Sequence, residues 1–141
     1  MKNLNQIIIS FTIIALLLFS SCKEDDPDPS LSKTELLTAS PWSPTEVKLS
    51  GFSGPVDACT ADDVYTFSTN GTFTFDEGPT KCEDEDPQAY SGTWEFNSAE
   101  TFLILSQDGF TIEKEILELS DIVMKLRFNI FGVEVEETFG K

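Results

Sequence analysis

Histidine is absent from the 141 residues of this sequence. Histidine is the usual base in Ser-His and Cys-His catalysis and a frequent zinc ligand, so both kinds of site are excluded. The three cysteines are too few to complete a zinc site by themselves. Carboxylates are plentiful, but abundance alone does not define the carboxylate pair of a glycoside hydrolase. We therefore expect no enzymatic activity, no catalytic residues, no metal site and no cofactor.

Basic side chains are scarce, since nine Lys and Arg face 25 Asp and Glu and the formal net charge is −16. Such a charge repels nucleic acid and anionic lipid head groups and keeps a folded domain soluble. We expect a monomer with no nucleic-acid partner. The acidic clusters lack the spaced acid-and-glycine pattern of an EF-hand loop, which favours a solvated acidic rim over a calcium site. These clusters are Asp62-Asp63, Asp76-Glu77 and Glu83-Asp84-Glu85-Asp86.

The sequence has one long hydrophobic run, the 13 residues from Ile7 to Phe19. A membrane-spanning helix needs about 20 apolar residues, so this run is too short to be one. It follows Lys2 and precedes two small residues, Ser20 and Ser21. A positively charged N-terminus, a short apolar segment and small residues at the cleavage site follow one another in this order in secretory signal peptides. We predict a signal peptide over residues 1–21.

The cleavage region Leu18-Phe19-Ser20-Ser21-Cys22 resembles the lipobox of bacterial lipoproteins, with Phe19 at the position where Leu is usual. The resemblance implies that Cys22 becomes the new N-terminus and carries acyl chains. Each buried CH₂ of such a chain contributes about 0.8 kcal/mol, so two or three chains hold a domain on a membrane. A disulfide at Cys22 would instead leave one of the two other cysteines unpaired.

The residues after Cys22, Lys-Glu-Asp-Asp-Pro-Asp-Pro-Ser, are too polar and too rich in proline to fold. We predict a flexible acidic tether over residues 22–36 and a folded domain over 37–141. The tract also resembles the acidic stretch that follows the acylated cysteine of Bacteroidetes lipoproteins. That resemblance implies a protein anchored by lipid in the outer membrane and exposed at the cell surface.

Cys59 and Cys82 remain once Cys22 is assigned to lipid attachment. Exported proteins can hold disulfides, and a domain of some 105 residues has a small core that benefits from one. This pair would close a loop of 24 residues, which on chain-entropy grounds stabilises the fold by about 3.5 kcal/mol. A metal pair would need further Cys or His ligands that the chain lacks. We predict a Cys59–Cys82 disulfide.

The rest of the chain alternates apolar and polar residues with a period of two and shows no clear helical periodicity, which predicts strands. The segments 64–68 and 72–75 flank Thr69-Asn70-Gly71, a hairpin signal. A two-residue Asn-Gly turn would pair Phe67 with Thr74 and place the aromatics on opposite faces. We predict a three-residue loop instead, because it gathers them on one face by pairing Phe67 with Phe73 and Tyr65 with Phe75.

A second hairpin is predicted at the C-terminus, where apolar residues alternate with charged ones from Ile122 onward. A turn centred on Ile130-Phe131 would place Phe128 opposite Val133 and Leu126 opposite Val135, so that apolar side chains meet. Farther upstream, Asp108-Gly109 favours a two-residue turn. The segment 102–105 is apolar on both faces, however, and leaves the register there open.

About eight consecutive strands joined mostly by short turns predict an all-β fold, a small up-and-down antiparallel barrel. The region contains an early Trp, a Cys before a D-D-x-Y-x-F strand, an N-G turn, a second Cys and a Y-x-G-x-W strand. The order of these motifs resembles that of the lipocalin-like domains of Bacteroidetes lipoproteins. This resemblance implies a lipocalin-like barrel. The matching residues are Trp42, Cys59, Asp62 to Phe67, Asn70-Gly71, Cys82 and Tyr90 to Trp94.

Alternation also predicts that seven aromatic side chains point into one shared interior: Tyr65, Phe67, Phe73, Phe75, Tyr90, Trp94 and Phe96. An eight-stranded barrel is just wide enough to be filled by its own side chains or to hold one small ligand, so these residues either form a core or line a cavity. We expect a surface lipoprotein that binds a small hydrophobic molecule or serves as an accessory to an envelope complex. The alternative is a glycan-binding or protein-interaction module with an exposed Trp or Tyr.

Overall fold

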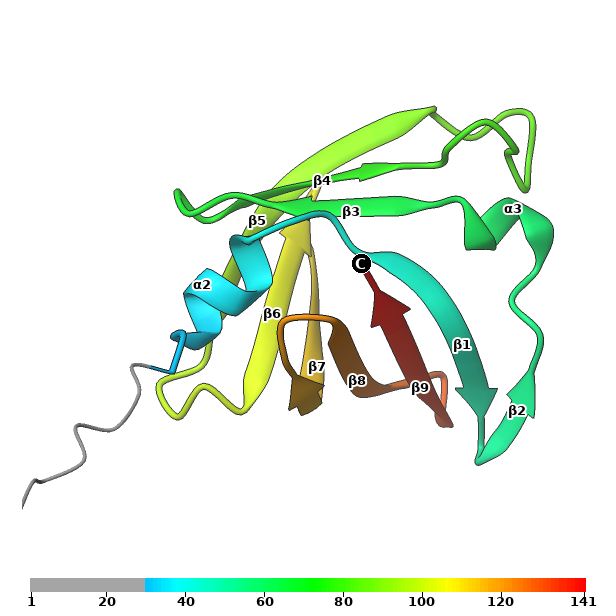
Figure 1. The fold of residues 1–141 in the computed structure, drawn as a ribbon. Coiled ribbons are helices and arrows are strands. Elements are labelled where there is room, and N and C mark those ends of the chain that lie inside the picture. Colours follow the sequence, from blue (N-terminus) through cyan, green and yellow to red (C-terminus); the bar gives the residue numbers. More distant parts are fainter. Residues whose placement is uncertain (1–29) are drawn as a thin grey trace, which may run out of the picture. The chain divides into compact units, whose positions relative to one another are not determined.

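The computed structural model describes residues 30–141, which form nine antiparallel strands and two short helices (Figure 1). The predicted signal peptide, the lipid-attachment residue Cys22 and most of the predicted tether lie outside the described residues. Neither helix between residues 30 and 141 has the length and apolar character needed to cross a membrane. The elements are α2 (Lys33–Thr38), β1 (Ser43–Leu49), β2 (Phe52–Gly54), α3 (Ala58–Ala61), β3 (Val64–Phe67), β4 (Thr72–Asp76), β5 (Ala89–Phe96), β6 (Phe102–Gln107), β7 (Phe110–Leu119), β8 (Val123–Ile130) and β9 (Val133–Gly140).

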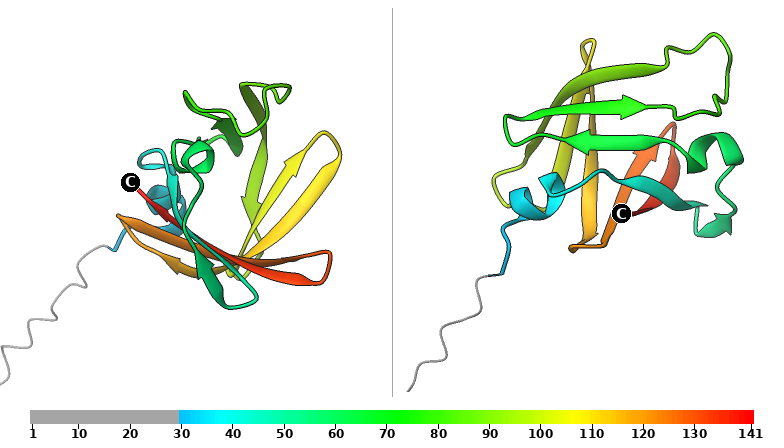
Figure 2. Two further views of the ribbon diagram at one scale, coloured as in Figure 1. Left: turned by 90° about the vertical axis from the view of Figure 1, so that its right-hand side faces the viewer. Right: turned by 45° about the horizontal axis from the view of Figure 1, so that its top comes forward.

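The strands from β3 to β9 follow one another as a meander, and β1 returns to pair with β9. The short strand β2 is attached to the other edge of β1. The sheet curls from β1, β9 and β8 through β7 and β6 to β5, β4 and β3 (Figure 2). Trp42, directly before β1, and Tyr65 on β3 exchange two backbone hydrogen bonds of 2.8 Å, which close the curled sheet at one point. The predicted all-β meander is confirmed, as a curled barrel with a single bridge across its seam.

The hairpin of β3 and β4 has the predicted register, with Phe67 opposite Phe73 and Tyr65 opposite Phe75. The register of β6 with β7, which the sequence pattern left open, is fixed by a two-residue turn at Asp108-Gly109. This turn pairs Gln107 with Phe110. Both turn residues have positive φ angles, 51° and 82°. This is the type I′ geometry, whose twist matches that of the flanking strands.

The C-terminal hairpin differs from its prediction by two residues. Phe128 lies opposite Val135, not Val133, because the turn is formed by Phe131-Gly132 with φ angles of 51° and 83°. Glycine tolerates the second of these angles, which favours a type I′ turn one residue later than predicted. A shift of two residues keeps every side chain on its predicted face but changes its partner. Leu126 therefore faces Glu137 across the strands.

A short helix, α2, covers one end of the barrel. Ser32 and Glu35 form a capping box, in which Glu35 N donates to Ser32 Oγ (3.2 Å) and Ser32 N donates to Glu35 Oε2 (2.8 Å). Leu37 is fully buried, and its carbonyl accepts a hydrogen bond of 2.9 Å from Nε1 of the fully buried Trp42. Residues 33–36, which the sequence assigned to the tether, are thus the first part of this helix. Six residues are too few to reveal a helical period.

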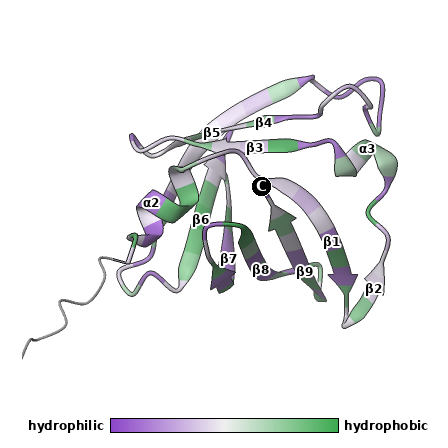
Figure 3. Ribbon diagram, viewed as in Figure 1, coloured by the Kyte–Doolittle hydropathy of each residue, from purple (hydrophilic) through white to green (hydrophobic). Residues whose placement is uncertain are grey.

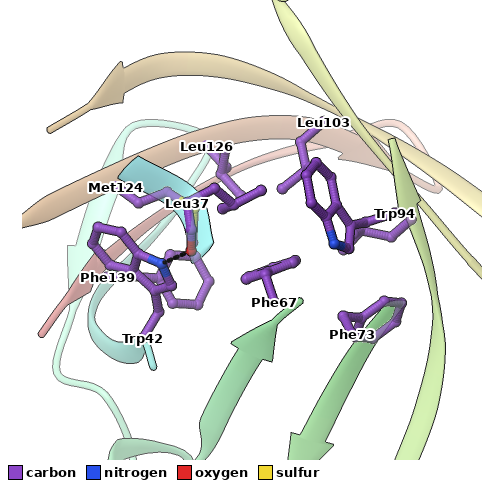
Figure 4. Packing of buried hydrophobic residues seen from close by; sticks show 10 residues of the cluster. Leu37, Trp42, Phe67, Phe73, Trp94, Leu103, Met124, Leu126 and Phe139 are labelled. Carbon is purple, nitrogen blue, oxygen red and sulfur yellow. Dashed lines mark hydrogen bonds between the residues drawn. The ribbon is translucent and has the colours of Figure 1, made fainter. Parts of the chain in front are cut away.

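The packed core lies at the α2 end of the barrel (Figure 4). β6 is hydrophobic along most of its length, whereas the loop between β4 and β5 is mostly hydrophilic (Figure 3). Gly92 allows close packing here, because a Cβ at this position would lie 2.3 Å from the Ser106 carbonyl oxygen and 2.6 Å from the Phe73 ring. The buried cluster contains Leu37, Trp42, Phe67, Phe73, Trp94, Leu103, Leu105, Met124, Leu126 and Phe139.

Candidate ligand cavity

The barrel is hollow at the end away from α2, where β6 and β8 finish and β7 begins. The cavity there has a volume of about 430 Å³, within the range of small-molecule sites. Its wall is mostly apolar and comes from six strands and the turn after β8. The lining residues are Tyr65, Phe73, Tyr90, Leu105, Gln107, Phe110, Thr111, Ile112, Lys114, Asn129, Ile130 and Phe131.

Three of the seven aromatic residues predicted to share an interior line this cavity: Tyr65, Phe73 and Tyr90. Phe75 lies beside them, stacked on Tyr90 with 4.6 Å between ring centroids. The remaining three, Phe67, Trp94 and Phe96, belong to the packed end or contact it. Ring contacts link all seven in one series, from Tyr65 at the cavity to Phe96 at the far end.

The rim of the cavity carries exposed aromatic side chains. Phe110 follows the Asp108-Gly109 turn and is 83% exposed, and Phe131 is 99% exposed. Phe131 also adopts a positive φ, which is costly for a residue with a large side chain. Neither ring belongs to the buried cluster, and both add apolar surface at the entrance of the cavity.

A charged pair that the sequence analysis missed lies inside the barrel. Lys114 is only 7% exposed, and its Nζ lies 2.6 Å from Glu137 Oε2 and 4.3 Å from the centroid of the Phe128 ring. Lys114 lies between Ile112 and Ile116 on the inward face of β7. A lysine in an otherwise apolar inward face is the feature of the sequence that could have indicated a buried charge. Its partner lies two strands away, on β9, and the alternation along β7 does not reveal it.

Two tyrosine side chains, Tyr65 and Tyr90, line the cavity. Burial, more than any nearby charge, raises the pKa of Tyr65 far above its ordinary value, and burial likewise raises the pKa of Tyr90. Both side chains therefore stay protonated at neutral pH. A neutral tyrosine hydroxyl can both donate and accept a hydrogen bond.

Asp63, expected on a solvated acidic rim, is buried with 8% of its surface exposed. Its Oδ1 has no hydrogen-bond partner among the described residues, and the same holds for Glu77 Oε2. Burial first, and then the nearby charge of Glu77, raise the pKa of Asp63 to about 6. In contrast, the stretch from Glu83 to Asp86 is exposed, as predicted.

The predicted disulfide is confirmed, with Cys59 and Cys82 joined by an S–S bond of 1.99 Å. It ties α3 to the loop between β4 and β5. The same loop is held by Asp62, whose Oδ2 accepts a hydrogen bond of 3.0 Å from Thr80 N. These links fix the loop beside the strands that form the aromatic wall.

Two other features of residues 30–141 bear on ligand binding. No group of three or more His, Cys, Asp or Glu side chains in this range is arranged to hold a metal ion. A second hollow, of about 470 Å³, lies beside β2 and is lined by residues from Val47 to Thr60. Its wall comes from one continuous part of the chain, from β1 to α3, and all three residues of β2 are exposed.

A curled antiparallel barrel that is packed at one end and hollow at the other is the architecture of small β-barrels that hold one ligand. Residues 40–126 match the family model of the lipocalin-like domain, and the chain belongs to this family. Its fold is similar to that of a lipocalin-like protein from Bacteroides uniformis, with a TM-score of 0.52 and 16% sequence identity. That similarity covers 75% of this chain and 98% of the other. A search of curated proteins gave no match.

Proposed function

We propose that this chain is a lipoprotein of the outer membrane whose lipocalin-like domain holds one small apolar molecule at the cell surface. The observation that carries the proposal is the cavity of about 430 Å³ with its largely apolar wall. A preformed concave site of this kind excludes water from an apolar ligand, which is the main driving force for its binding. The exposed rings of Phe110 and Phe131 extend the apolar surface outward to the entrance.

The proposed role is binding and not catalysis. Among the lining residues, Lys114 is the only charged side chain, and it is already paired with Glu137. The hydroxyl of Thr111 lies 2.9 Å from that of Ser106, which is a poor general base. The cavity therefore offers surfaces that position a molecule and no activated group that attacks one.

A second candidate, a module that docks another protein of the envelope, is favoured by the exposed apolar residues at the open end. Phe52, Phe110 and Phe131 each lie in or directly after a hairpin turn, and all three are strongly exposed. Two of these residues also line the cavity, however, and the aromatic series continues inward from it. This continuity favours binding of a small molecule in the cavity over docking of another protein.

An apolar fluorescent probe such as N-phenyl-1-naphthylamine is expected to bind at about one per chain. Replacing Ile112 with tryptophan should reduce the probe affinity at least tenfold, because the larger ring occupies part of the cavity. A fluorescence titration gives the stoichiometry and affinity. Native mass spectrometry of protein purified gently from its own cells would also reveal a ligand that remains bound.

The matched control for this titration is Ile122→Trp, which adds the same ring at an exposed position between β7 and β8, at the packed end. Probe affinity should remain within twofold of the unmodified protein. Probe binding that is absent, or that survives Ile112→Trp unchanged, would show that the barrel cavity is not the binding site.

Lipid attachment at Cys22 is tested by replacing this residue with serine. The unmodified protein should fractionate with membranes, and its mature mass should include the acyl chains. The Cys22→Ser variant should lose that added mass and leave the membrane fraction, because the signal peptide then ends at a residue that cannot be acylated. Retention of the variant in the membrane at an unchanged mature mass would refute the proposed anchor.

A further inference from the structure

Three two-residue hairpin turns project from the open end of the barrel (Figure 2). They are Ser50-Gly51 between β1 and β2, Asp108-Gly109 between β6 and β7, and Phe131-Gly132 between β8 and β9. In each turn φ is 51° at the first residue and between 81° and 83° at the glycine, which is the type I′ geometry. The antiparallel pairing of β1 with β9 and of β7 with β8 places all three turns at the same end of the sheet.

The surface around these turns is apolar and almost free of charge. We call residues 49–56, 107–111 and 129–133 the hairpin rim. Asp108 is its only charged residue, whereas 24% of the whole chain is charged. Between residues 30 and 141, six of the nine large apolar residues that are exposed belong to the hairpin rim: Leu49, Phe52, Phe110, Ile130, Phe131 and Val133. Exposed apolar surface gathered in this way marks a site of contact with a protein or a membrane.

The hairpin rim is continuous with the barrel cavity. Phe110, Ile130 and Phe131 belong both to the rim and to the lining of the cavity. Leu49 and Phe52 line the second hollow beside β2. Whatever covers the hairpin rim therefore also faces the entrance of the proposed ligand site.

The composition and shape of the hairpin rim fit a lipid surface better than a protein partner. The rim contains no Arg, Tyr, Trp or Met, which are the residues enriched where proteins meet. The rings of Phe52, Phe110 and Phe131 are 81%, 83% and 99% exposed, so each stands out from its own turn and does not pack into a flat patch. Separate protruding apolar groups can be covered by fluid acyl chains without a matching surface.

The charges beside the hairpin rim select the kind of lipid. Thr93 pairs with Ser106, so β5 begins at the end of the barrel where β6 finishes. The loop that precedes β5 carries the exposed acidic residues from Glu83 to Asp86, and the whole chain has a formal charge of −16. Such charges repel anionic head groups, which favours uncharged or zwitterionic ones.

The proposed acyl anchor can reach a membrane that faces the hairpin rim. Ten residues lead from Cys22 to Ser32 at the start of α2. A chain of that length spans at most about 35 Å, while the eight residues of β8 extend over about 26 Å. The connection is therefore long enough to pass from the packed end of the barrel to the open end.

We infer that the hairpin rim contacts a bilayer surface of uncharged or zwitterionic lipids, with the rings of Phe52, Phe110 and Phe131 among the outer parts of the acyl chains. The cavity then opens toward the lipid, and an apolar ligand passes between the two without crossing water. The inference rests on the proposed function for the anchor that brings the domain to a membrane, and it adds which surface of the domain meets the lipid.

Tryptophan reporters in the mature, anchored protein test the inference. Phe52→Trp and Phe131→Trp each add an indole to the hairpin rim, and the matched control Ile122→Trp adds one at an exposed position of the packed end. Each protein is reconstituted in vesicles of phosphatidylcholine with or without brominated acyl chains, which quench indole fluorescence on contact. The signal of the unmodified protein, whose Trp42 and Trp94 are buried, is subtracted.

Brominated lipid should lower the emission of the added indole at least twofold in both rim variants and leave that of Ile122→Trp unchanged. In vesicles with one third phosphatidylglycerol, quenching at the rim should be weaker at low ionic strength, and stronger quenching there overturns the choice of lipid. Quenching at Ile122→Trp that equals or exceeds quenching at the rim overturns the inference. An unquenched rim on protein that stays with the vesicles also overturns it, favours a protein partner for the rim and leaves the anchor standing. A protein that does not associate with the vesicles contradicts the anchor as well.

Discussion

Replacing Trp94 with alanine is expected to lower the free energy of unfolding by about 3–5 kcal/mol while leaving probe binding at the cavity nearly unchanged. The indole packs edge-on against Phe67 and Phe96, with centroid separations of 6.1 Å and 5.4 Å, and its Nε1 donates to the Ser68 carbonyl at 3.0 Å. Truncation leaves a void in the packed end and a carbonyl without its donor. Chemical denaturation followed by circular dichroism measures the change.

Phe110→Ala is the matched control for Trp94→Ala, because it removes another large aromatic side chain from an exposed position at the cavity rim. It should change the free energy of unfolding by no more than about 0.5 kcal/mol and weaken probe binding. A Trp94→Ala protein of normal stability that no longer binds the probe would place Trp94 in the cavity wall and contradict the division of the barrel into a packed and a hollow end.

Reduction of the Cys59–Cys82 disulfide is expected to lower the free energy of unfolding by about 3.5 kcal/mol. The 24-residue loop that it closes contains β3 and β4, which carry four of the seven aromatic residues of the interior. The cross-link reduces the entropy of the unfolded chain, so its loss favours unfolding even though the native contacts of the sheet remain. Denaturation curves with and without a thiol reductant give the difference.

The double variant Cys59→Ala/Cys82→Ala should unfold at the midpoint of the reduced protein, with or without reductant. Reductant should therefore have no further effect on it, which separates loss of the disulfide from other actions of the thiol. An unmodified protein whose unfolding is insensitive to full reduction would contradict the stabilising role of this bond.

The two hairpins show where sequence patterns suffice and where they do not. Between β3 and β4, aromatic residues on both strands make one register bury far more apolar surface than the others, so the pairing of Phe67 with Phe73 was predictable. Between β8 and β9, registers that differ by two residues place the same side chains inside. Which of these registers forms then depends on the backbone angles of the turn at Phe131-Gly132. The apolar pattern of the strands carries no information on these angles.

The buried polar residues of the barrel, Asp63 and Lys114, were less predictable than the aromatic wall of the cavity. Lys114 and Glu137 interrupt the apolar faces of two different strands, and their pairing requires the correct register of the strands between them. Asp63 belongs to an acidic cluster, and acidic side chains are usually exposed to solvent. The sequence therefore predicted that Asp63 is exposed as well. In the structure this side chain is only 8% exposed, directly before the start of β3.

The sequence by itself determined the class of fold, the inward face of the aromatic strands and the pairing of Cys59 with Cys82, because these follow from local alternation and from the count of cysteines. Only the tertiary structure decided which end of the barrel is filled and which is hollow. That division depends on α2 and Trp42 filling one end while the type I′ turns leave the other open. Residues from distant parts of the chain meet there, and whether their volumes fill the space between curled strands is a property of the closed sheet and not of any segment.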